Sequence, residues 1–400
     1  MSNREETRQR IMAEARAAFP DMVRWRRAIH ENPEASYCEA ETAALAAREL
    51  YAMGAFEVTE NVGGHGVIAK MKGGKSGPST ALRADMDALH VEEETGLPFA
   101  SKKPGLMHAC GHDMHTAMLL GAAKVIAALR EEVRGDVTFV FQPAEEVDTG
   151  GGSRDILESG ALSGIDRIFG IHVWPELKSG TLMSKDGAMM ASSDHFEIEI
   201  TGRSGHGAQP QNAADAIAAG AAVYQAIQTI VSRGIDPQQP AVVTVGKFNA
   251  GTRYNVIAGK CVLEGTCRTF DPAVRERCHA RLREIAEILP KAYGCEGRVE
   301  IARGNMPLIN DAACAALVRR NAAELFGAER VTDELKPSMC AEDFSYYLSK
   351  IPGAFIFLGA TREGEQFYPL HSSRFAPPEE IMEMGAALHA GMVMLGGAED

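Results

Sequence analysis

The sequence predicts an α/β protein with a mainly parallel sheet, interrupted by a second domain of α+β type. Three observations predict this fold class. Short apolar strands alternate with helical patterns from the N-terminus onward, the pattern changes near Ala188, and the alternation resumes from about Gly304. Strands that alternate with helices favour a layered fold with a parallel sheet. We therefore expect a first domain made of residues 1–187 and 304–400, with residues 188–303 inserted into it.

The first domain is expected to begin with two helices, at Met12–Glu31 and at about Glu39–Met53. Four short apolar strands follow, at Gly66–Met71, Thr80–Arg83, Val137–Phe141 and Ile168–Val173. Between the second and third strands, the alanine-rich segment Met114–Leu129 has the apolar spacing of a core-facing helix. After the insertion, the domain is expected to resume with a helix (Ala312–Phe326), a strand (Ala354–Leu358) and a helix (Pro378–Met394).

The inserted segment begins with HFEIEITG, in which apolar and polar residues alternate as in a half-exposed antiparallel strand. The elements expected after it are a helix, two strands, a helix and a strand, at Ala213–Val231, Ala241–Phe248, Asn255–Phe270, Pro272–Leu289 and Gly297–Ala302. The order strand–helix–strand–strand–helix–strand is the signature of a ferredoxin-like sandwich.

Composition excludes several classes of protein. With 400 residues, 45% of them hydrophobic, the chain can bury more than one core. Its net charge of -13 argues against nucleic acid or an anionic membrane as a general partner. We expect no membrane span, because no apolar run reaches about 18 residues. We expect a cytoplasmic protein, because the N-terminus lacks the apolar core of a signal peptide. The eight cysteines lack disulfide-type spacing and are expected to be reduced.

The densest group of chemically active side chains lies in the segment LMHACGHDMHTA. It contains His108, Cys110, His112, Asp113 and His115 at a predicted strand-to-helix junction. Thiolate and imidazole are both good ligands of zinc-like ions. A capping or core role is the alternative for each residue taken singly, but it explains the whole group poorly.

Two adjacent carboxylates, Glu145 and Glu146, end the strand in FQPAEE. Neighbouring residues of an extended chain point in different directions, so one carboxylate can ligate a metal while the other faces water. That division suits metal-assisted hydrolysis, with a carboxylate as the general base. A solvated acidic pair opening a loop is the alternative reading of this segment alone.

Other strand ends carry similar side chains. His172 lies near the end of IFGIHVW, Asp85 and Asp87 follow the strand in RADMDAL, and His371 lies in YPLHSSRF. Each is more often structural than functional when taken singly. In open α/β sheets, however, sites collect at the carboxyl ends of strands, and here several ends each offer a metal-competent residue.

The inserted domain offers His206 in GRSGHGAQP, Arg253 and Asn255 in TRYN, and Arg268 in CRTF. Such groups could polarise a carbonyl and bind a carboxylate. Surface positions explain them equally well, so composition alone assigns them no role.

The motifs RADMDAL, MHACGHDMHTA, FQPAEE, GIHVWP, GHGAQP and LHSSRF, in this order, resemble the two-metal aminoacylase and carboxypeptidase family of peptidases. The similarity covers nearly the whole chain. It is greatest to the amidohydrolase branch, which includes hippurate hydrolase, N-acyl-L-amino acid amidohydrolases and indole-acetyl-amino-acid hydrolases. The resemblance implies a metallopeptidase domain whose inserted domain serves as lid and dimer interface, in a homodimer or a dimer-based tetramer.

The resemblance also implies a role for each matching residue. Two divalent ions per subunit, Zn²⁺ or Mn²⁺ with Co²⁺ or Ni²⁺ as alternatives, would bind to Cys110, His112, Glu146, His172 and His371. Glu145 would be the general base and acid, and Asp87 the carboxylate that supports the site. His206 would stabilise the oxyanion in the neighbouring subunit, and Asn255 and Arg268 would hold the substrate carboxylate.

The implied activity is hydrolysis of N-acyl-L-amino acids of the hippurate or N-acetyl type. A dipeptidase or carboxypeptidase and an N-acetyl-diaminopimelate-type deacetylase are the alternatives that share this machinery. A catalytically silent binding protein is a further alternative, against which the intact Glu145 and five candidate ligands argue. The chain departs from the family pattern at His65, His90, Gln211 and Ala258, which leaves the preferred acyl group and amino acid open.

Overall fold

The structure, a computed structural model, describes residues 3–147 and 150–396, which form two compact units. Unit 1 takes in the chain up to Met189, Ile309–Lys336 and the chain from Asp343 onward. Unit 2 takes in Met190–Leu308 and Pro337–Glu342. The chain passes from unit 1 to unit 2 after Met189 and returns after Leu308, whereas the sequence predicted these boundaries after residues 187 and 303. The short segment 337–342, expected with the first domain, groups with unit 2 instead.

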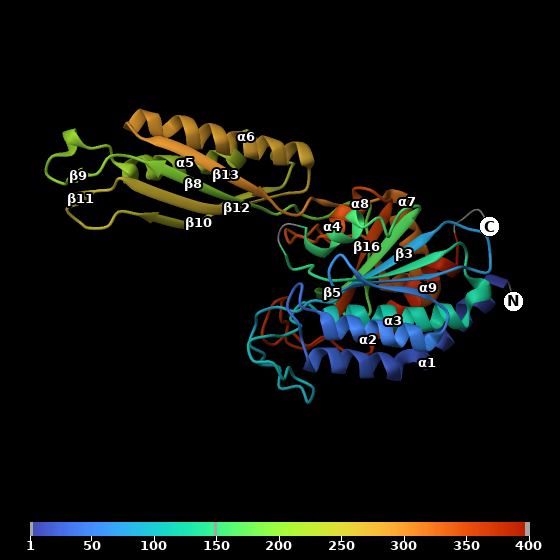
Figure 1. Cartoon of the computed structure of the whole chain (residues 1–400). Helices are drawn as coiled ribbons and strands as arrows, with labels where there is room; N and C mark the ends of the chain where they lie inside the picture. Colours follow the sequence, from blue (N-terminus) through green and yellow to red (C-terminus); the bar gives the residue numbers. More distant parts are fainter. Residues whose placement is uncertain (1–2, 148–149, 397–400) are drawn as a thin grey trace. The chain divides into compact units, whose positions relative to one another are not determined.

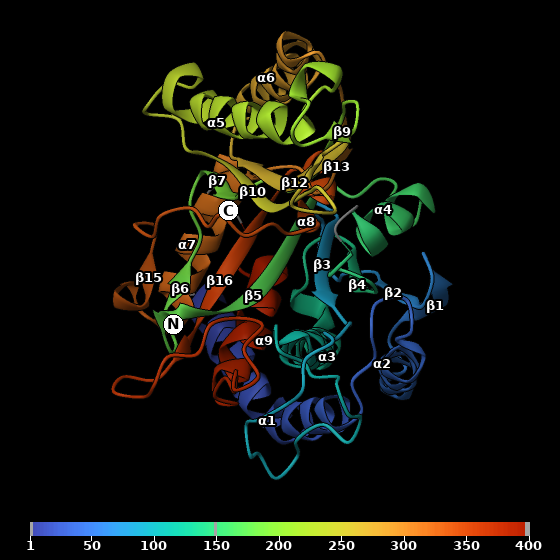
Figure 2. The same cartoon turned by 90° about the vertical axis from the view of Figure 1, so that its left-hand side faces the viewer.

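Unit 1 is built on an eight-stranded mixed sheet in the order β1-β2-β4-β3-β5-β16-β6-β15 (Figure 2). Its central strands β4, β3, β5 and β16 run parallel, which gives the expected largely parallel sheet, while β1 and β2 are antiparallel additions. The strands are β1 (Glu57–Val62), β2 (Gly66–Met71), β3 (Thr80–Asp85), β4 (Val137–Gln142), β5 (Arg167–Lys178), β6 (Leu182–Met183), β15 (Val331–Thr332) and β16 (Gly353–Thr361).

Helices cover one face of this sheet: α1 (Asn3–Glu31), α2 (Ala40–Met53), α3 (His112–Ala128) and α9 (Ile381–Met394), as Figure 2 shows. The helix α3 is buried along nearly its whole length, between the sheet and the helices α1 and α9. Beyond the polar residues of its first turn and the exposed Lys124, α3 is apolar on all sides, as expected of a helix in such a position. The remaining elements are α7 (Ala312–Phe326), α4 (Gly151–Glu158), α8 (Phe344–Leu348), β7 (Gly187–Met190) and β14 (Leu308–Asn310).

Strand β1 and helix α4 were not expected from the sequence. Strand β1 pairs through one edge only, and its residues are exposed or half-exposed. Its sequence EVTENV therefore carries polar residues where an apolar alternation would have indicated a strand. Helix α4 begins at a glycine pair, which is a poor helix signal.

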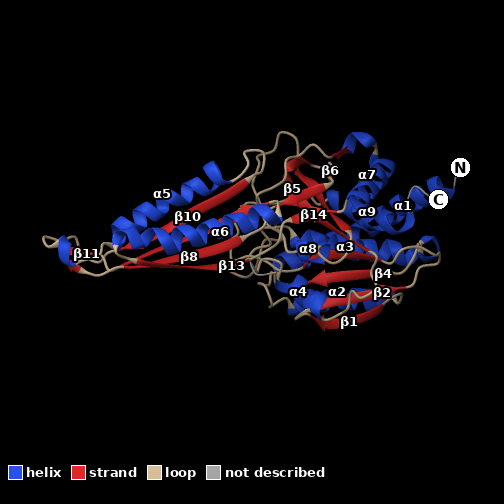
Figure 3. Cartoon of the chain, turned by 90° about the horizontal axis from the view of Figure 1, so that it is seen from above, coloured by secondary structure: helices blue, strands red, loops and turns tan. Residues whose placement is uncertain are grey.

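Unit 2 contains an antiparallel four-stranded sheet in the order β10-β12-β8-β13. Helices α5 and α6 lie side by side on one face of it (Figures 1 and 3), with an apolar core between helices and sheet. Along the chain the elements are β8 (Asp194–Thr201), α5 (Ala216–Gly234), β10 (Ala241–Ala250), β12 (Lys260–Thr269), α6 (Pro272–Ile288) and β13 (Glu296–Arg303). This is the expected order of strands and helices.

The strand expected at Asn255–Phe270 is wrong in one respect, because it is divided in two. Its first residues form β11 (Val256–Ile257), which pairs with β9 (Gly205–His206), and β12 begins only at Lys260. The division lies at Ala258 and Gly259, where Gly259 accepts a backbone hydrogen bond from Gly202. A continuous apolar pattern did not reveal this change of pairing partner.

Among the helices of residues 3–147 and 150–396, none combines the length and the apolarity needed to cross a bilayer. No disulfide joins any of the eight cysteines, all of which lie in the described part of the chain.

Candidate metal centre

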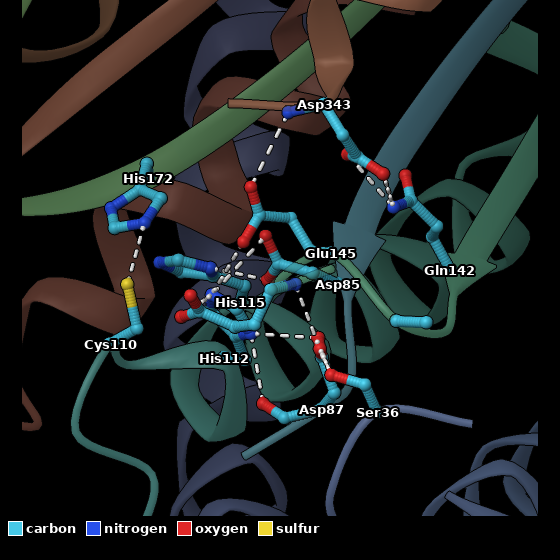
Figure 4. A network of polar contacts seen from close by, with 12 residues as sticks. Ser36, Asp85, Asp87, Cys110, His112, His115, Gln142, Glu145, His172 and Asp343 are labelled. Atoms are coloured by element: carbon cyan, nitrogen blue, oxygen red, sulfur yellow. Dashed lines mark hydrogen bonds and ion pairs between the residues drawn. The ribbon is translucent and has the colours of Figure 1, made fainter. Parts of the chain in front are cut away.

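Cys110 and His112 flank the tight turn that begins helix α3 (Figure 4). The turn residue, Gly111, has φ 89°, and a Cβ atom there would lie 2.4 Å from Cγ2 of Val173. Only glycine satisfies both conditions, so the turn depends on it. The turn brings Cys110 Sγ to 3.4 Å from Nε2 of His172, which extends from strand β5. The potential ligand atoms of Cys110, His112 and His172 all lie within 4.8 Å of one another.

A second group of potential ligand atoms, those of Cys110, Glu146 and His371, also lies within 4.8 Å. Oε1 of Glu146 is 3.4 Å from Nε2 of His371 and 3.9 Å from Nε2 of His112. His371 has φ 65°, and its N–H group donates to the carbonyl of Ala109 at 2.8 Å, which ties its loop to the Cys110 segment. Cys110 belongs to both groups, so its sulfur lies within 4.8 Å of the potential ligand atoms of each.

The hydrogen bonds of the two buried histidines leave their inward-facing nitrogens available. Nδ1 of His172 donates to the Val173 carbonyl at 2.7 Å, and Nδ1 of His112 donates to the Asp87 carbonyl at 2.9 Å. Nε2 of His112 and Oε1 of Glu146 are buried and have no hydrogen-bond partner among the described residues. Buried polar atoms that make no hydrogen bond are costly, and a bound cation would compensate both of these atoms.

The charge of the site also suits cations. Burial lowers the pKa of His112, but the nearby carboxylates of Asp85, Asp87 and Glu146 outweigh burial and raise that pKa to about 10. The cluster therefore attracts positive charge strongly. Its donor set of sulfur, imidazole and carboxylate fits zinc or another late first-row divalent ion.

The carboxylate of Asp87 connects two of the potential ligands, His112 and Glu146. Its Oδ1 is 3.2 Å from Nδ1 of His112, and its Oδ2 accepts the backbone N–H of Glu146 at 3.0 Å and the hydroxyl of Ser36 at 2.7 Å. One carboxylate thus orients the His112 ring and fixes the backbone of Glu146. Burial raises the pKa of Asp87, but the His112 and Ser36 hydrogen bonds outweigh burial and lower it.

Glu145 is largely buried, and its carboxylate lies within 4.8 Å of the potential ligand atoms of His112 and Glu146. Its Oε1 accepts the backbone N–H of Asp343 at 3.4 Å, and its Oε2 is 4.0 Å from Nε2 of His112. Asp343 accepts a hydrogen bond from Arg83 at 3.0 Å. It also accepts one from Gln142 at 2.7 Å (Figure 4). A carboxylate fixed at this distance from the ligand atoms can exchange a proton with a molecule between them.

His115 and Asp85 were candidates that the structure places behind the ligands. Nε2 of His115 accepts the backbone N–H of Val173 at 2.9 Å, so its Nδ1 carries the proton and donates to Oδ1 of Asp85 at 2.6 Å. Oδ2 of Asp85 pairs with Arg83 at 2.6 Å. Both nitrogens of His115 are therefore engaged, and the pair supports strand β5 rather than offering open ligand positions.

Asp113 and His108 do not join the cluster. Asp113 pairs with His30 at 2.8 Å and with Arg26 at 3.1 Å, and all three side chains are buried. Neither ring nitrogen of His108 has a hydrogen-bond partner in the described residues, and burial lowers its pKa to about 4. Adjacent residues of a helix point about 100° apart, so closeness in sequence to His112 did not bring Asp113 to the site.

The candidates of unit 2 fall into two places within that unit. His206 pairs with Val256 across the β9–β11 ribbon, and Gly207 donates a 2.9 Å hydrogen bond to the carbonyl of Asn255, so His206 and Asn255 are neighbours. Arg268 lies at the other end of β12, eight residues from Lys260. Such a stretch of strand is about 26 Å long at about 3.3 Å per residue.

Unit 2 also contains a buried group that resembles a ligand set, made of Asp194, Cys267 and His279. Both oxygens of Asp194 are already occupied, by Arg275 at 2.5 and 2.9 Å and by Nε2 of His279 at 2.8 Å. The buried guanidinium supplies the positive charge that Asp194 requires. This group therefore joins helix α6 to strand β8, and we assign no cation to it.

Three residues that contact the site were missed from the sequence: Ser36, Glu39 and Asp343. The carboxylate of Glu39 accepts a hydrogen bond from the backbone N–H of Ala144, the residue before Glu145. Asp343 acts through its backbone N–H. In the sequence, only the acidic residues of ASYCEAE and AEDF could have indicated that these segments contact the site. Neither segment has the spacing of a ligand motif.

Comparison with known proteins identifies the family. Residues 81–395 match the model of peptidase family M20/M25/M40. The chain belongs to this family. It is accordingly a hydrolase that acts on amide bonds, and the resemblance inferred from its motifs is confirmed.

Individual relatives are named for different activities. The chain is 42% identical to an N-acetyl-L-cysteine deacetylase of Bacillus subtilis, over 86% of this chain and 81% of the relative. It is 38% identical to thermostable carboxypeptidase 2 of Saccharolobus solfataricus, over 92% and 93%. A crystal structure described as a dinuclear metal-binding M20 peptidase from Bacillus subtilis is 35% identical and has a TM-score of 0.83, covering 95% of this chain and 98% of that one.

Proposed function

We propose that this M20 hydrolase cleaves the amide bond of N-acyl-L-amino acids, releasing a carboxylate and a free amino acid. The observation that carries the proposal is the position of Glu145, whose Oε2 is 4.0 Å from Nε2 of His112 and which directly precedes Glu146. Neither that nitrogen nor Oε1 of Glu146 makes a hydrogen bond with the described residues. A proton-transferring carboxylate at an array of metal-competent atoms suits amide hydrolysis. The relatives named as a deacetylase and a carboxypeptidase support the same reaction class.

We propose Cys110, His112, Glu146, His172 and His371 as the residues that hold two divalent cations, Zn²⁺ or Mn²⁺ first and Co²⁺ or Ni²⁺ as alternatives. Cations bound there would supply Lewis acidity, which lowers the pKa of water and polarises an amide carbonyl. Asp87 keeps His112 and Glu146 in position through the hydrogen bonds described above. The use of a cysteine thiolate suits a reducing compartment, and we propose the cytoplasm.

Glu145 would move the proton in both halves of the reaction. As water adds to the acyl carbon, Glu145 accepts one of its protons on the carboxylate. It then gives that proton to the amide nitrogen, so that the C–N bond breaks and the amine leaves. The hydrogen bond from the Asp343 N–H to Oε1 leaves Oε2 on the side of His112, where the transfer takes place.

Unit 2 would complete the site as lid and dimer interface, in a homodimer or a dimer-based tetramer. His206 would stabilise the oxyanion, while Asn255 and Arg268 would bind the substrate carboxylate. One small substrate cannot reach both His206 and Arg268 of the same chain, because a length of β12 of about 26 Å separates them. This separation supports a site in which His206 and Asn255 come from the partner subunit.

The test is a pair of variants assayed on a panel of N-acetyl- and N-benzoyl-amino acids, dipeptides and N-acetyl-diaminopimelate. Glu145→Gln is expected to lower kcat by about 10²-fold or more while keeping bound metal. Glu146→Ala is expected to lose metal as well as turnover. Turnover by Glu145→Gln near the parental rate would refute the role of Glu145. Faster cleavage of dipeptides than of N-acyl amino acids would favour the peptidase alternative.

A further inference from the structure

Glu39, at the N-terminus of helix α2, is a buried carboxylate outside the two groups of potential ligands that share Cys110. Its Oε1 accepts two backbone N–H groups, that of Tyr37 at 2.9 Å and that of Ala144 at 2.7 Å. Ala144 directly precedes Glu145 and Glu146. A single oxygen therefore connects the 36–39 segment to the turn that carries both proposed functional carboxylates.

Both residues held by Glu39 have an unfavourable backbone conformation. Tyr37 has φ 64° and Ala144 has φ 53°, in the left-handed region that residues with a Cβ atom rarely adopt. Such conformations persist only where the surroundings enforce them. The hydrogen bond from Ala144 to Glu39 is a direct means of enforcing the turn before Glu145.

The neighbouring residue Ser36 acts on the same turn from its other side. Its hydroxyl donates to Oδ2 of Asp87, and the same oxygen accepts the N–H of Glu146. The Tyr37 hydroxyl donates to Asp155 in helix α4 at 2.8 Å, which fixes the segment further. The turn is thus held at Ala144 by Glu39 and at Glu146 by Asp87, and Glu145 lies between these two points.

We propose that Glu39 is a positioning residue for the hydrolysis: it holds Ala144 in its left-handed conformation and thereby sets the directions of Glu145 and Glu146. The inference rests on the proposed function of those two carboxylates. Without the acceptor, Ala144 would relax toward ordinary φ values and rotate the two residues that follow. The role requires a hydrogen-bond acceptor at Oε1 and does not require a charge, so glutamine should serve in place of glutamate.

Glu34 offers a matched control on the same segment of the chain. It is also a buried carboxylate that accepts backbone N–H groups, those of Thr42 at 2.8 Å and Glu41 at 3.1 Å in the first turn of α2. Its side chain makes no hydrogen bond to Ala144. Removing it should disturb the fold without releasing the turn before Glu145.

The experiment compares Glu39→Ala, Glu39→Gln and Glu34→Ala in the cobalt-loaded enzyme. Glu39→Ala is expected to lower kcat by about 10²-fold, because a displacement of about 1 Å of a reacting group costs this much. It should also change the visible absorption of bound Co²⁺, since Glu146 moves. Glu39→Gln should restore most of the turnover and the parental spectrum. Glu34→Ala should lower the unfolding midpoint comparably but leave kcat and the spectrum near parental values.

Equal losses of kcat in Glu39→Ala and Glu34→Ala would overturn the proposal, because they would reduce Glu39 to a stabilising role. A parental kcat and spectrum in Glu39→Ala would also overturn it. Failure of the proposed function has a different signature. If Glu145→Gln kept parental turnover, the role of Glu145 would be refuted, while the Co²⁺ spectrum of Glu39→Ala would still report whether Glu39 positions Glu146.

Discussion

Arg83 and Asp85 form a buried ion pair on strand β3, with Nη1 2.6 Å from Oδ2. The other oxygen of Asp85 accepts the hydrogen bond from His115, which in turn accepts the backbone N–H of Val173, next to His172. The pair therefore links strand β3, helix α3 and strand β5 behind the candidate ligands. The ion pair should therefore contribute measurably to the free energy of unfolding.

Asp85→Ala is expected to lower the free energy of unfolding by about 3 kcal/mol. The buried guanidinium of Arg83 would no longer pair with this carboxylate, while Asp343 and the amide of Gln142 would remain as its partners. Urea denaturation measures this loss. The control is Glu363→Ala, which removes an exposed ion pair with Lys178 and should leave the unfolding midpoint unchanged. A loss no larger in Asp85→Ala than in the control would contradict the assignment.

His30 should make the stability depend on pH. Burial lowers its pKa, but Asp113 and Glu93 outweigh burial and raise the pKa to about 9, from an ordinary value of 6.5. The protonated ring stabilises the fold fully below pH 6.5, and this contribution is lost as the pH rises through about 9. The expected loss in the free energy of unfolding is up to about 3 kcal/mol.

The measurement is the free energy of unfolding between pH 6.5 and 9.5 for the parent, His30→Gln and the exposed control His90→Gln. The parent and His90→Gln should lose stability over this range, and His30→Gln should lose markedly less. Parallel curves for all three proteins would show that His30 is neutral in the folded state.

Hybrid dimers test whether His206 acts on the partner subunit. His206→Ala and Glu145→Gln homodimers should both be nearly inactive. After equal mixing and exchange of subunits, half of the dimers are mixed and each has one intact composite site, so about a quarter of the parental activity should return. Mixed dimers that form but remain inactive would place His206 in the site of its own chain.

Much of the candidate site could be predicted because its residues lie in recognisable local motifs. Cys110 and His112 lie at the start of helix α3, Glu146 follows strand β4, and His172 lies within strand β5. Cys110, His112, Glu146, His172 and His371 come from four distant segments, and the parallel core of the sheet brings these segments to one edge. Periodicity likewise placed helix α7 at its observed bounds. These motifs and periodicities involve residues close together in the chain, so they can be recognised in a single sequence.

The roles of Glu39, Asp343 and Asp113 could not be predicted from the sequence. Glu39 and Asp343 act through hydrogen bonds with backbone N–H groups, which have no residue signature. Asp113 was grouped with its neighbour His112, yet the helix turns it toward Arg26 and His30. In both cases the deciding quantity is a direction in space, which a spacing along the chain does not give.

The measurement that tests the central claim most directly is the metal content of the chain, determined by elemental analysis together with turnover. The parent, loaded with Zn²⁺ or Mn²⁺, should hold two ions per chain, and a chelator should remove the ions and the activity together. Returning either metal should restore turnover. Full hydrolysis of N-acyl amino acids by a chain that holds no metal would contradict the account.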